Sequence, residues 1–115
     1  MKDNPLLKNS ERLAVDIEAL CKTLERKDNS NAIFQIRKSS SSVFANINEA
    51  IYGNSKADFI SKLHISLKET GESIYWLTLL KRTNLIEYNF DELLSLAEEI
   101  KRMLIASLNT AKENK

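Results

Sequence analysis

Apolar residues recur along this chain at alternating spacings of three and four, which is the period of an α-helix that buries one face. In the first part of the chain this stripe comprises Leu13, Ile17, Leu20 and Leu24. Segments of this kind predict helices over about residues 5–27, 31–52, 56–83 and 90–112. Because the connections are short, neighbouring helices are expected to run antiparallel. The sequence therefore predicts a single all-α domain over residues 1–115, folded as an antiparallel up-down-up-down four-helix bundle.

Turn and capping residues mark the ends of these segments. The polar run 28–31 contains no apolar residue and separates the first two helices. Gly53 followed by Asn54 is typical of a helix C-terminus. Ser55 precedes Asp58 by three residues, which resembles a capping box at the start of the third helix. Asn89 precedes Glu92 by the same distance and resembles a capping box at the start of the fourth helix.

The second predicted helix has few charges. They are Arg37, Lys38 and Glu49, and the rest of its surface is apolar or small nearly all round. A helix of this kind is normally covered on more than one side, so we expect it to be central or to face another subunit. The run Ser39–Ser42 is interpreted as packing, since short side chains allow close helix approach and each hydroxyl can bond to a preceding carbonyl.

The third predicted helix is long, and a glycine lies near its middle. Its expected core stripe is Phe59, Leu63, Leu67, Ile74 and Leu77, with Trp76, Leu79 and Leu80 beside it. Gly71 costs about 1 kcal/mol relative to alanine inside a helix. Close packing of a neighbour against Gly71 would offset that cost.

Composition narrows the classes of protein further. Two glycines and one proline leave little turn chemistry, which argues against many-turned all-β folds. The 17 Lys and Arg nearly balance 16 Asp and Glu, unlike the strongly basic composition of many nucleic-acid binders. The single cysteine, Cys21, lies on the apolar stripe of the first helix and is expected to be buried. The chain shows no signal peptide or membrane-spanning run, so a cytoplasmic location without membrane contact is expected.

Three motifs in the middle of the sequence resemble a known family. They are the segments 36–50, 55–63 and 67–77, with Ser-Lys-x-Asp-Phe in the second and Lys-Glu-x-x-Glu-x-x-Tyr-Trp-Leu in the third. This pattern is similar to the bacterial four helix bundle protein family, also called the 23S ribosomal RNA intervening-sequence protein family. The residues that carry this resemblance, and that we associate with assembly, are Ser42, Asn46, Glu49, Ser55, Asp58, Phe59, Lys68, Glu69, Glu72, Tyr75 and Trp76.

The resemblance implies a small antiparallel bundle that assembles as a homo-oligomeric ring, with a pentamer favoured. It also implies a gene sometimes found inside intervening sequences of large-subunit ribosomal RNA. The resemblance further implies that this chain is related to the accessory variability protein of diversity-generating retroelements. That protein is a basic pentameric barrel that binds nucleic acid and a reverse transcriptase. No catalytic residue comes with the family, and this chain differs from the retroelement relatives in being nearly neutral.

Two carboxylates in the third motif deserve a chemical interpretation. Glu69 and Glu72 are three residues apart and share a helix face, so they could in principle hold a metal. Di-metal bundles require Glu-x-x-His, however, and the only histidine, His64, follows Ser61 rather than a carboxylate at that spacing. We therefore expect neither a metal site nor another cofactor.

The alternative interpretation of this motif is structural. Glu72 or Glu69 is expected to pair with Arg37 or Lys38 on the neighbouring helix or across a subunit boundary. Trp76 is expected to anchor packing, with its indole N–H on a polar partner.

Basic residues gather at one end of the predicted bundle. Antiparallel topology brings six of them together: Arg26, Lys27, Arg37, Lys38, Lys81 and Arg82. Acidic residues near the same end reduce its net charge to about +1. Cations at helix C-termini are in any case expected from the helix dipole alone. In a ring this edge would be repeated around the symmetry axis, which makes RNA or DNA a candidate partner.

These observations favour a non-enzymatic, homo-oligomeric helical scaffold, with nucleic acid as a candidate partner. The first alternative is a protein-binding module whose second helix accepts a partner helix. The second is a metal-dependent nuclease, which would require clustered carboxylates or a histidine paired with another acid–base group. The sequence indicates no small-molecule substrate.

Overall fold

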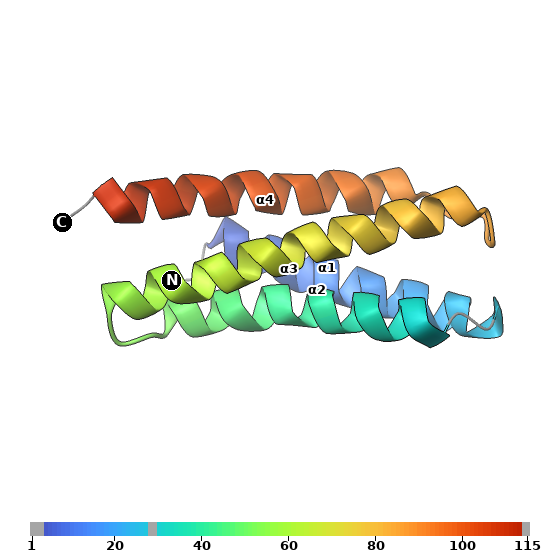
Figure 1. Cartoon of the computed structure of the whole chain (residues 1–115), viewed down its shortest axis with the longest axis horizontal. Helices are drawn as coiled ribbons and strands as arrows, with labels where there is room; N and C mark the ends of the chain where they lie inside the picture. Colours follow the sequence, from blue (N-terminus) through green and yellow to red (C-terminus); the bar gives the residue numbers. More distant parts are fainter. Residues whose placement is uncertain (1–3, 28–29, 114–115) are drawn as a thin grey trace.

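The computed structural model describes residues 4–27 and 30–113, with the backbone alone at residues 27 and 30. Within these ranges the elements are α1 (Pro5–Leu24), a 3-10 turn η1 (Glu25–Lys27), α2 (Ser30–Ile51), α3 (Lys56–Thr83) and α4 (Phe90–Glu113). Consecutive helices run in opposite directions along a body of about 49 × 24 × 20 Å (Figure 1). The predicted all-α, up-down-up-down four-helix bundle is confirmed.

Local hydrogen bonds account for the helix ends. The side chain of Asn4 accepts from the Leu7 amide at 3.0 Å and caps α1, whose first residue is a proline. Ser55 Oγ accepts from the Asp58 amide at 3.0 Å and caps α3. At the other end of α3, Asn84 adopts the left-handed conformation with φ 55°, which asparagine tolerates better than most residues.

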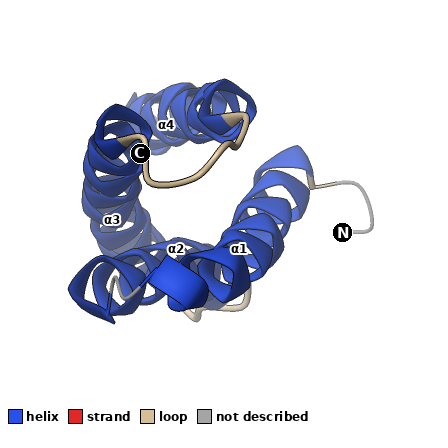
Figure 2. Cartoon of the chain, turned by 90° about the vertical axis from the view of Figure 1, so that its right-hand side faces the viewer, coloured by secondary structure: helices blue, strands red, loops and turns tan. Residues whose placement is uncertain are grey.

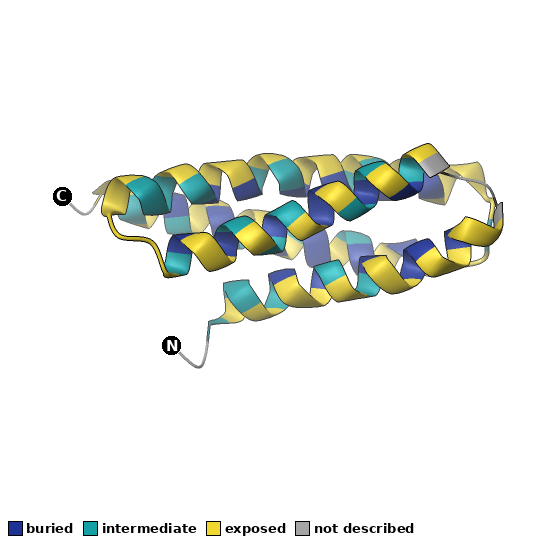
Figure 3. Ribbon diagram, turned by 90° about the horizontal axis from the view of Figure 1, so that it is seen from below, coloured by how far each residue is buried: buried dark blue, intermediate teal, exposed yellow. Residues whose placement is uncertain are grey.

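The core lies between the four helices and is mostly aliphatic. Figure 3 shows buried positions along the inner side of each helix and exposed positions along the outside. The largest fully buried side chains include Leu13, Ile17, Leu20, Leu24, Ile36, Ile47, Leu63, Leu77, Ile100 and Leu104. Each side chain of this size contributes about 1.5–3 kcal/mol when it is removed from water. Burial of these stripes is what holds the helices together.

The buried stripe of α3 differs from the one expected from the sequence. Leu63, Leu77 and Leu80 are buried, but the three positions between them that face the core are Ser66, Thr70 and Ser73. Of the expected members, Phe59, Leu67, Ile74 and Trp76 are only partly buried, and Leu79 is exposed. The buried side of α3 therefore carries hydroxyls at its centre.

Two of these hydroxyls, those of Ser66 and Ser73, join α3 to α2. Ser66 Oγ donates to the Val43 carbonyl at 2.9 Å, and the hydroxyls of Ser39 and Ser73 share a hydrogen bond of 2.8 Å. Thr70 Oγ1 donates to the Ser66 carbonyl at 2.8 Å. Contacts between helices are most extensive between α2 and α3. Small hydroxylated side chains let the two backbones approach closely while every buried hydroxyl keeps a partner.

The serine run of α2 behaves as a packing segment. Ser39 and Ser40 are buried, and their hydroxyls donate to the carbonyls of Ile36 and Arg37 at 3.3 and 3.4 Å. Ser41 is exposed and Ser42 is half-buried. The four side chains thus point in different directions around the helix.

Among adjacent helices, α1 and α4 share the fewest contacts. Viewed along the bundle, α1, α2, α3 and α4 follow one another around the core, with the widest separation between the first and the last (Figure 2). The α2–α3 pair is consequently the tightest part of the fold.

Candidate functional site

Most of the residues that carry the family resemblance lie along one edge of the bundle, which we call the α2–α3 seam. On α2, Ser42, Asn46 and Glu49 follow one another at helical spacing, and on α3 Glu69 and Trp76 flank the buried stripe. Except for the exposed Glu49, these side chains are half-buried. The seam brings together motifs from two separate segments of the sequence.

Polar contacts run along the seam. Lys62 Nζ of α3 lies 3.1 Å from Glu49 Oε1 of α2, and this carboxylate raises the pKa of Lys62. Asn46 Nδ2 donates to both the carbonyl and the Oγ of Ser42, at 2.9 and 3.0 Å. Of these contacts only the Lys62–Glu49 ion pair joins the two helices, near the turn where Ser55 caps α3.

The environment of Glu69, on the α3 side of the seam, changes the pKa of its carboxyl group. Burial raises the pKa of Glu69, and the neighbouring charge of Glu72, with which it shares a hydrogen bond, raises it further. Lys68 and Lys38 act in the opposite direction. Across the part of the chain that the structure describes, no group of three or more His, Cys, Asp and Glu side chains could hold a metal ion. His64 is exposed.

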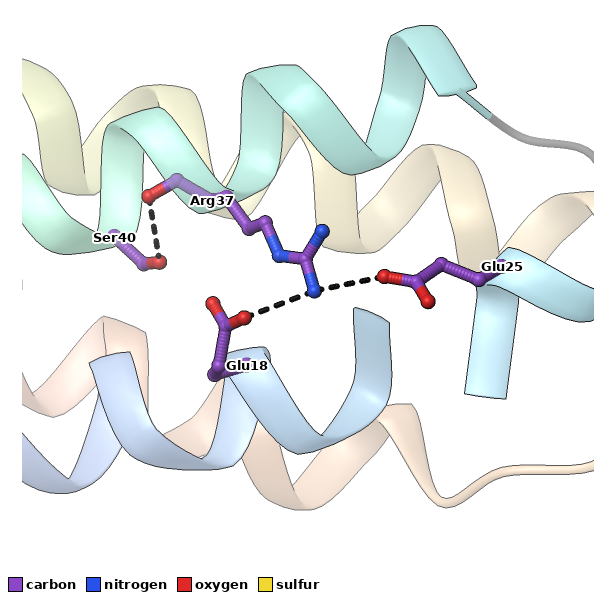
Figure 4. Close-up of polar contacts among 4 residues, drawn as sticks. All are labelled: Glu18, Glu25, Arg37 and Ser40. Atoms are coloured by element: carbon purple, nitrogen blue, oxygen red, sulfur yellow. Dashed lines mark hydrogen bonds and ion pairs between the residues drawn. The ribbon is translucent and has the colours of Figure 1, made fainter. Parts of the chain in front are cut away.

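Arg37 forms ion pairs that the sequence analysis did not foresee. Its Nη2 lies 2.9 Å from Glu18 Oε1 and 3.0 Å from Glu25 Oε1, between α1 and η1 (Figure 4). These two hydrogen bonds raise the pKa of the guanidinium. The expected pairing of Arg37 with Glu69 or Glu72 inside the chain is wrong, because Arg37 lies on the side of α2 that faces α1.

Trp76 also differs from expectation. It is half-buried and packs edge-on against Tyr75, with ring centroids 5.0 Å apart. Its Nε1 is buried and has no hydrogen-bond partner among the described residues. The polar partner expected for the indole is therefore not present within this part of the chain.

The outward face of α3 carries large apolar side chains, although the centre of its inward face is polar. Ile65, Tyr75 and Leu79 are 41%, 58% and 42% exposed, while the hydroxyls described above are buried. On α2, Phe34 and Tyr52 are also largely exposed. Large apolar side chains thus remain on the outer surfaces of the two most tightly packed helices.

The predicted basic end is partly neutralised. Arg37 is held by two glutamates, and Lys81 Nζ lies 2.6 Å from Asp91 Oδ1. Arg26, Lys38 and Arg82 are exposed and form no ion pair with any residue that the structure describes. The side chain of Lys27 lies outside the described residues. Of the five predicted basic residues whose side chains the structure describes, three are therefore exposed without an ion pair to a described residue.

The loosely packed α1–α4 edge carries a further cluster that sequence reasoning missed. Arg12 Nε lies 3.6 Å from Asp16 Oδ2, and Arg12 Nη2 lies 3.7 Å from Glu92 Oε1. A hollow of about 160 Å³ adjoins these side chains. Burial, followed by the charges of Asp16 and Glu92, raises the pKa of the nearby Tyr88. The i, i+4 spacing of Arg12 and Asp16 was the only sequence signal for this cluster.

Among the described residues, no helix is both long and apolar enough to cross a membrane.

Comparison with known proteins identifies the family of the chain. Residues 2–106 match the family model described as 23S rRNA-intervening sequence protein. No curated protein matches the chain.

A solved structure supports the same assignment. The chain is similar to a protein from Bacteroides thetaiotaomicron VPI-5482, whose crystal structure is described as that of a protein with unknown function from the S23 ribosomal protein family. The two sequences are 41% identical, the TM-score is 0.86, and the match covers 95% of this chain and 99% of the other. This chain belongs to the 23S rRNA-intervening sequence protein family.

Proposed function

We propose that the chain is a non-enzymatic scaffold of the cytoplasm that assembles with copies of itself into a ring, with a pentamer favoured. The observation that carries this proposal is the distribution of polar and apolar side chains around α3. Its buried centre consists of Ser66, Thr70 and Ser73, while Tyr75 and Leu79 remain exposed. A helix that keeps apolar side chains on its outer surface is normally covered on that side as well.

The energetics support a protein partner on this surface. Complete burial of a large apolar side chain contributes about 1.5–3 kcal/mol, so covering several of them offers a substantial driving force. The exposed side chains on α2 and α3 are Phe34, Tyr52, Ile65, Tyr75 and Leu79. The family resemblance supports a second copy as the partner, since it implies a homo-oligomeric ring.

Native mass measured by light scattering during gel filtration tests the proposal. One chain has a mass of 13.1 kDa, so a pentamer of five such chains is expected at about 66 kDa. Tyr75→Glu combined with Leu79→Glu should lower the mass, whereas Asn109→Glu combined with Thr110→Glu, which adds the same two negative charges on exposed α4 surface, should not. A wild-type mass of 13.1 kDa at all concentrations would contradict assembly and would favour docking of a different partner helix.

A second candidate function is the binding of RNA or DNA at the basic end. The observation that favours it is that Arg26 and Arg82 are exposed and form no ion pair with any residue that the structure describes. Repetition of these cations around a ring would give many weak contacts with a phosphate backbone. Binding is then expected to weaken steeply as salt is raised. No binding to either nucleic acid at low salt would contradict this function without affecting the scaffold.

A further inference from the structure

Gly71 lies in the middle of α3 on its outward side, and the space beside it is empty. An added Cβ at Gly71 would meet no atom within 4 Å. Its φ is not positive, so the backbone does not require glycine here. A glycine inside an exposed helix lowers helix stability, and nothing within the described chain compensates for it. A neighbour that packs against Gly71 is therefore not found within the described chain.

The residues around Gly71 are suited to contact with another helix. Tyr75, one turn further along α3, is 58% exposed, and Leu79 follows it at 42%. Glu72 is exposed, shares a hydrogen bond with Glu69 and forms no ion pair with the described residues. Absence of a side chain at Gly71 would allow a second helix to approach the α3 backbone closely, with apolar and acidic groups to one side.

The outward side of α2 has complementary features. Its middle carries the small exposed residues Ser41 and Ala45, and Phe34 and Tyr52 extend from it on either side at 62% and 71% exposure. Lys38 is exposed on the same helix and forms no ion pair with the described residues, although its charge lowers the pKa of Glu69 in its own chain. A second copy can therefore offer small side chains opposite Gly71, apolar side chains beyond them, and a cation for Glu72.

The arrangement of the helices also suits closure of a ring. Because α2 and α3 are neighbours around the four-helix bundle, their outward sides face different directions (Figure 2). A contact between α3 of one copy and α2 of the next is heterologous, because it joins different surfaces of the two copies. Repetition of such a contact closes a ring when the rotations between successive copies sum to a full turn.

We propose that the outward side of α3 receives α2 of a second copy, and that the two helices cross at Gly71. This inference rests on the proposed assembly and adds the identity of the contacting helices. Gly71 provides the close approach, while Glu72 on one copy faces Lys38 on the next.

Substitution of Gly71 gives opposite effects on folding and on assembly, which makes the proposal testable. Gly71→Ala should raise the urea midpoint of the dilute chain, because it restores helix propensity without a clash. The same change should weaken assembly by roughly tenfold in dissociation constant, because the added methyl group overpacks the crossing. Gly71→Leu should weaken it more. Asn109→Ala, on exposed α4 surface, should raise stability and leave assembly unchanged.

Charge reversal identifies the helix that crosses α3. Glu72→Lys and Lys38→Glu should each weaken assembly, and the double variant should restore most of it, since every contact between copies then pairs opposite charges again. Assembly unchanged by Gly71→Ala would overturn the crossing at Gly71, and failure of the double variant to assemble would overturn α2 as the occupant. A wild-type chain that is monomeric at every concentration would instead refute the underlying proposal of assembly, and this inference with it.

Discussion

At the scale of single residues, Cys21 shows how burial controls reactivity. Its side chain is fully buried, and burial raises the pKa of the thiol to about 11, although the charge of Arg37 acts in the opposite direction. At pH 8 only about one thiol in a thousand would be ionised, and the thiolate is the reactive form. We expect the folded protein to react with dithiobisnitrobenzoate far more slowly than the protein in urea. Equal rates, followed by absorbance, would show that Cys21 is accessible.

Glu69 provides a pH-dependent prediction. Because burial and Glu72 raise the pKa of Glu69 above 4.5, the folded state holds this proton at pH values where the unfolded state has lost it. Stability therefore falls as pH rises from about 4.5 through the folded-state pKa. Glu69→Gln should reduce this fall and raise the urea midpoint at pH 7. Glu11→Gln, which removes an exposed negative charge from α1, controls for net charge. A steeper fall in Glu69→Gln would contradict the assigned cause.

At the scale of secondary structure elements, the hydroxyl stripe limits the volume available between α2 and α3. Ser73 is fully buried and its hydroxyl bonds to Ser39, so Ser73→Leu must force the helices apart. We expect a loss of about 1–3 kcal/mol in the free energy of unfolding, measured in urea at fixed protein concentration. Ser95→Leu, the same change on exposed α4 surface, should change it by less than about 0.5 kcal/mol. Equal effects would show that the α2–α3 contact is not closely packed.

The same stripe explains which features of the elements were predictable. Helical spacing and caps such as Ser55 located the helices, because those signals are local in the chain. The buried side of α3 was harder to predict, because Ser66, Thr70 and Ser73 are polar and a hydropathy pattern assigns polar residues to the surface. Their burial depends on partners in α2 and in the preceding turn, which the sequence of α3 alone does not contain.

At the scale of the whole molecule, the candidate surfaces were predictable by location but not by pairing. Antiparallel topology was enough to place basic residues at one end, because helix direction follows from short connections. It could not show that Arg37 faces α1, where Glu18 and Glu25 bind it, since that depends on how far α2 is rotated about its axis. Likewise, the motif around Glu69 identified the seam, whereas the empty space beside Gly71 became visible only in three dimensions.

The distinction between paired and unpaired cations yields a prediction for nucleic-acid binding. Arg26 and Arg82 are exposed without ion pairs in the described chain, whereas Lys81 is held by Asp91. If this end contacts phosphates, Arg26→Ala combined with Arg82→Ala should weaken RNA binding and reduce the slope of log affinity against log salt by about one for each residue that contacts a phosphate.

Lys81→Ala is the matched control for these two arginines, because its charge is already offset by Asp91. It should have a smaller effect on both affinity and salt dependence, measured by fluorescence anisotropy at several salt concentrations while light scattering verifies that assembly is intact. If Lys81→Ala weakened binding as much as the arginine pair, the ion pair would have to open on binding, and the unpaired cations would no longer define the contact surface. If none of the variants altered binding, RNA would have to bind elsewhere on the molecule.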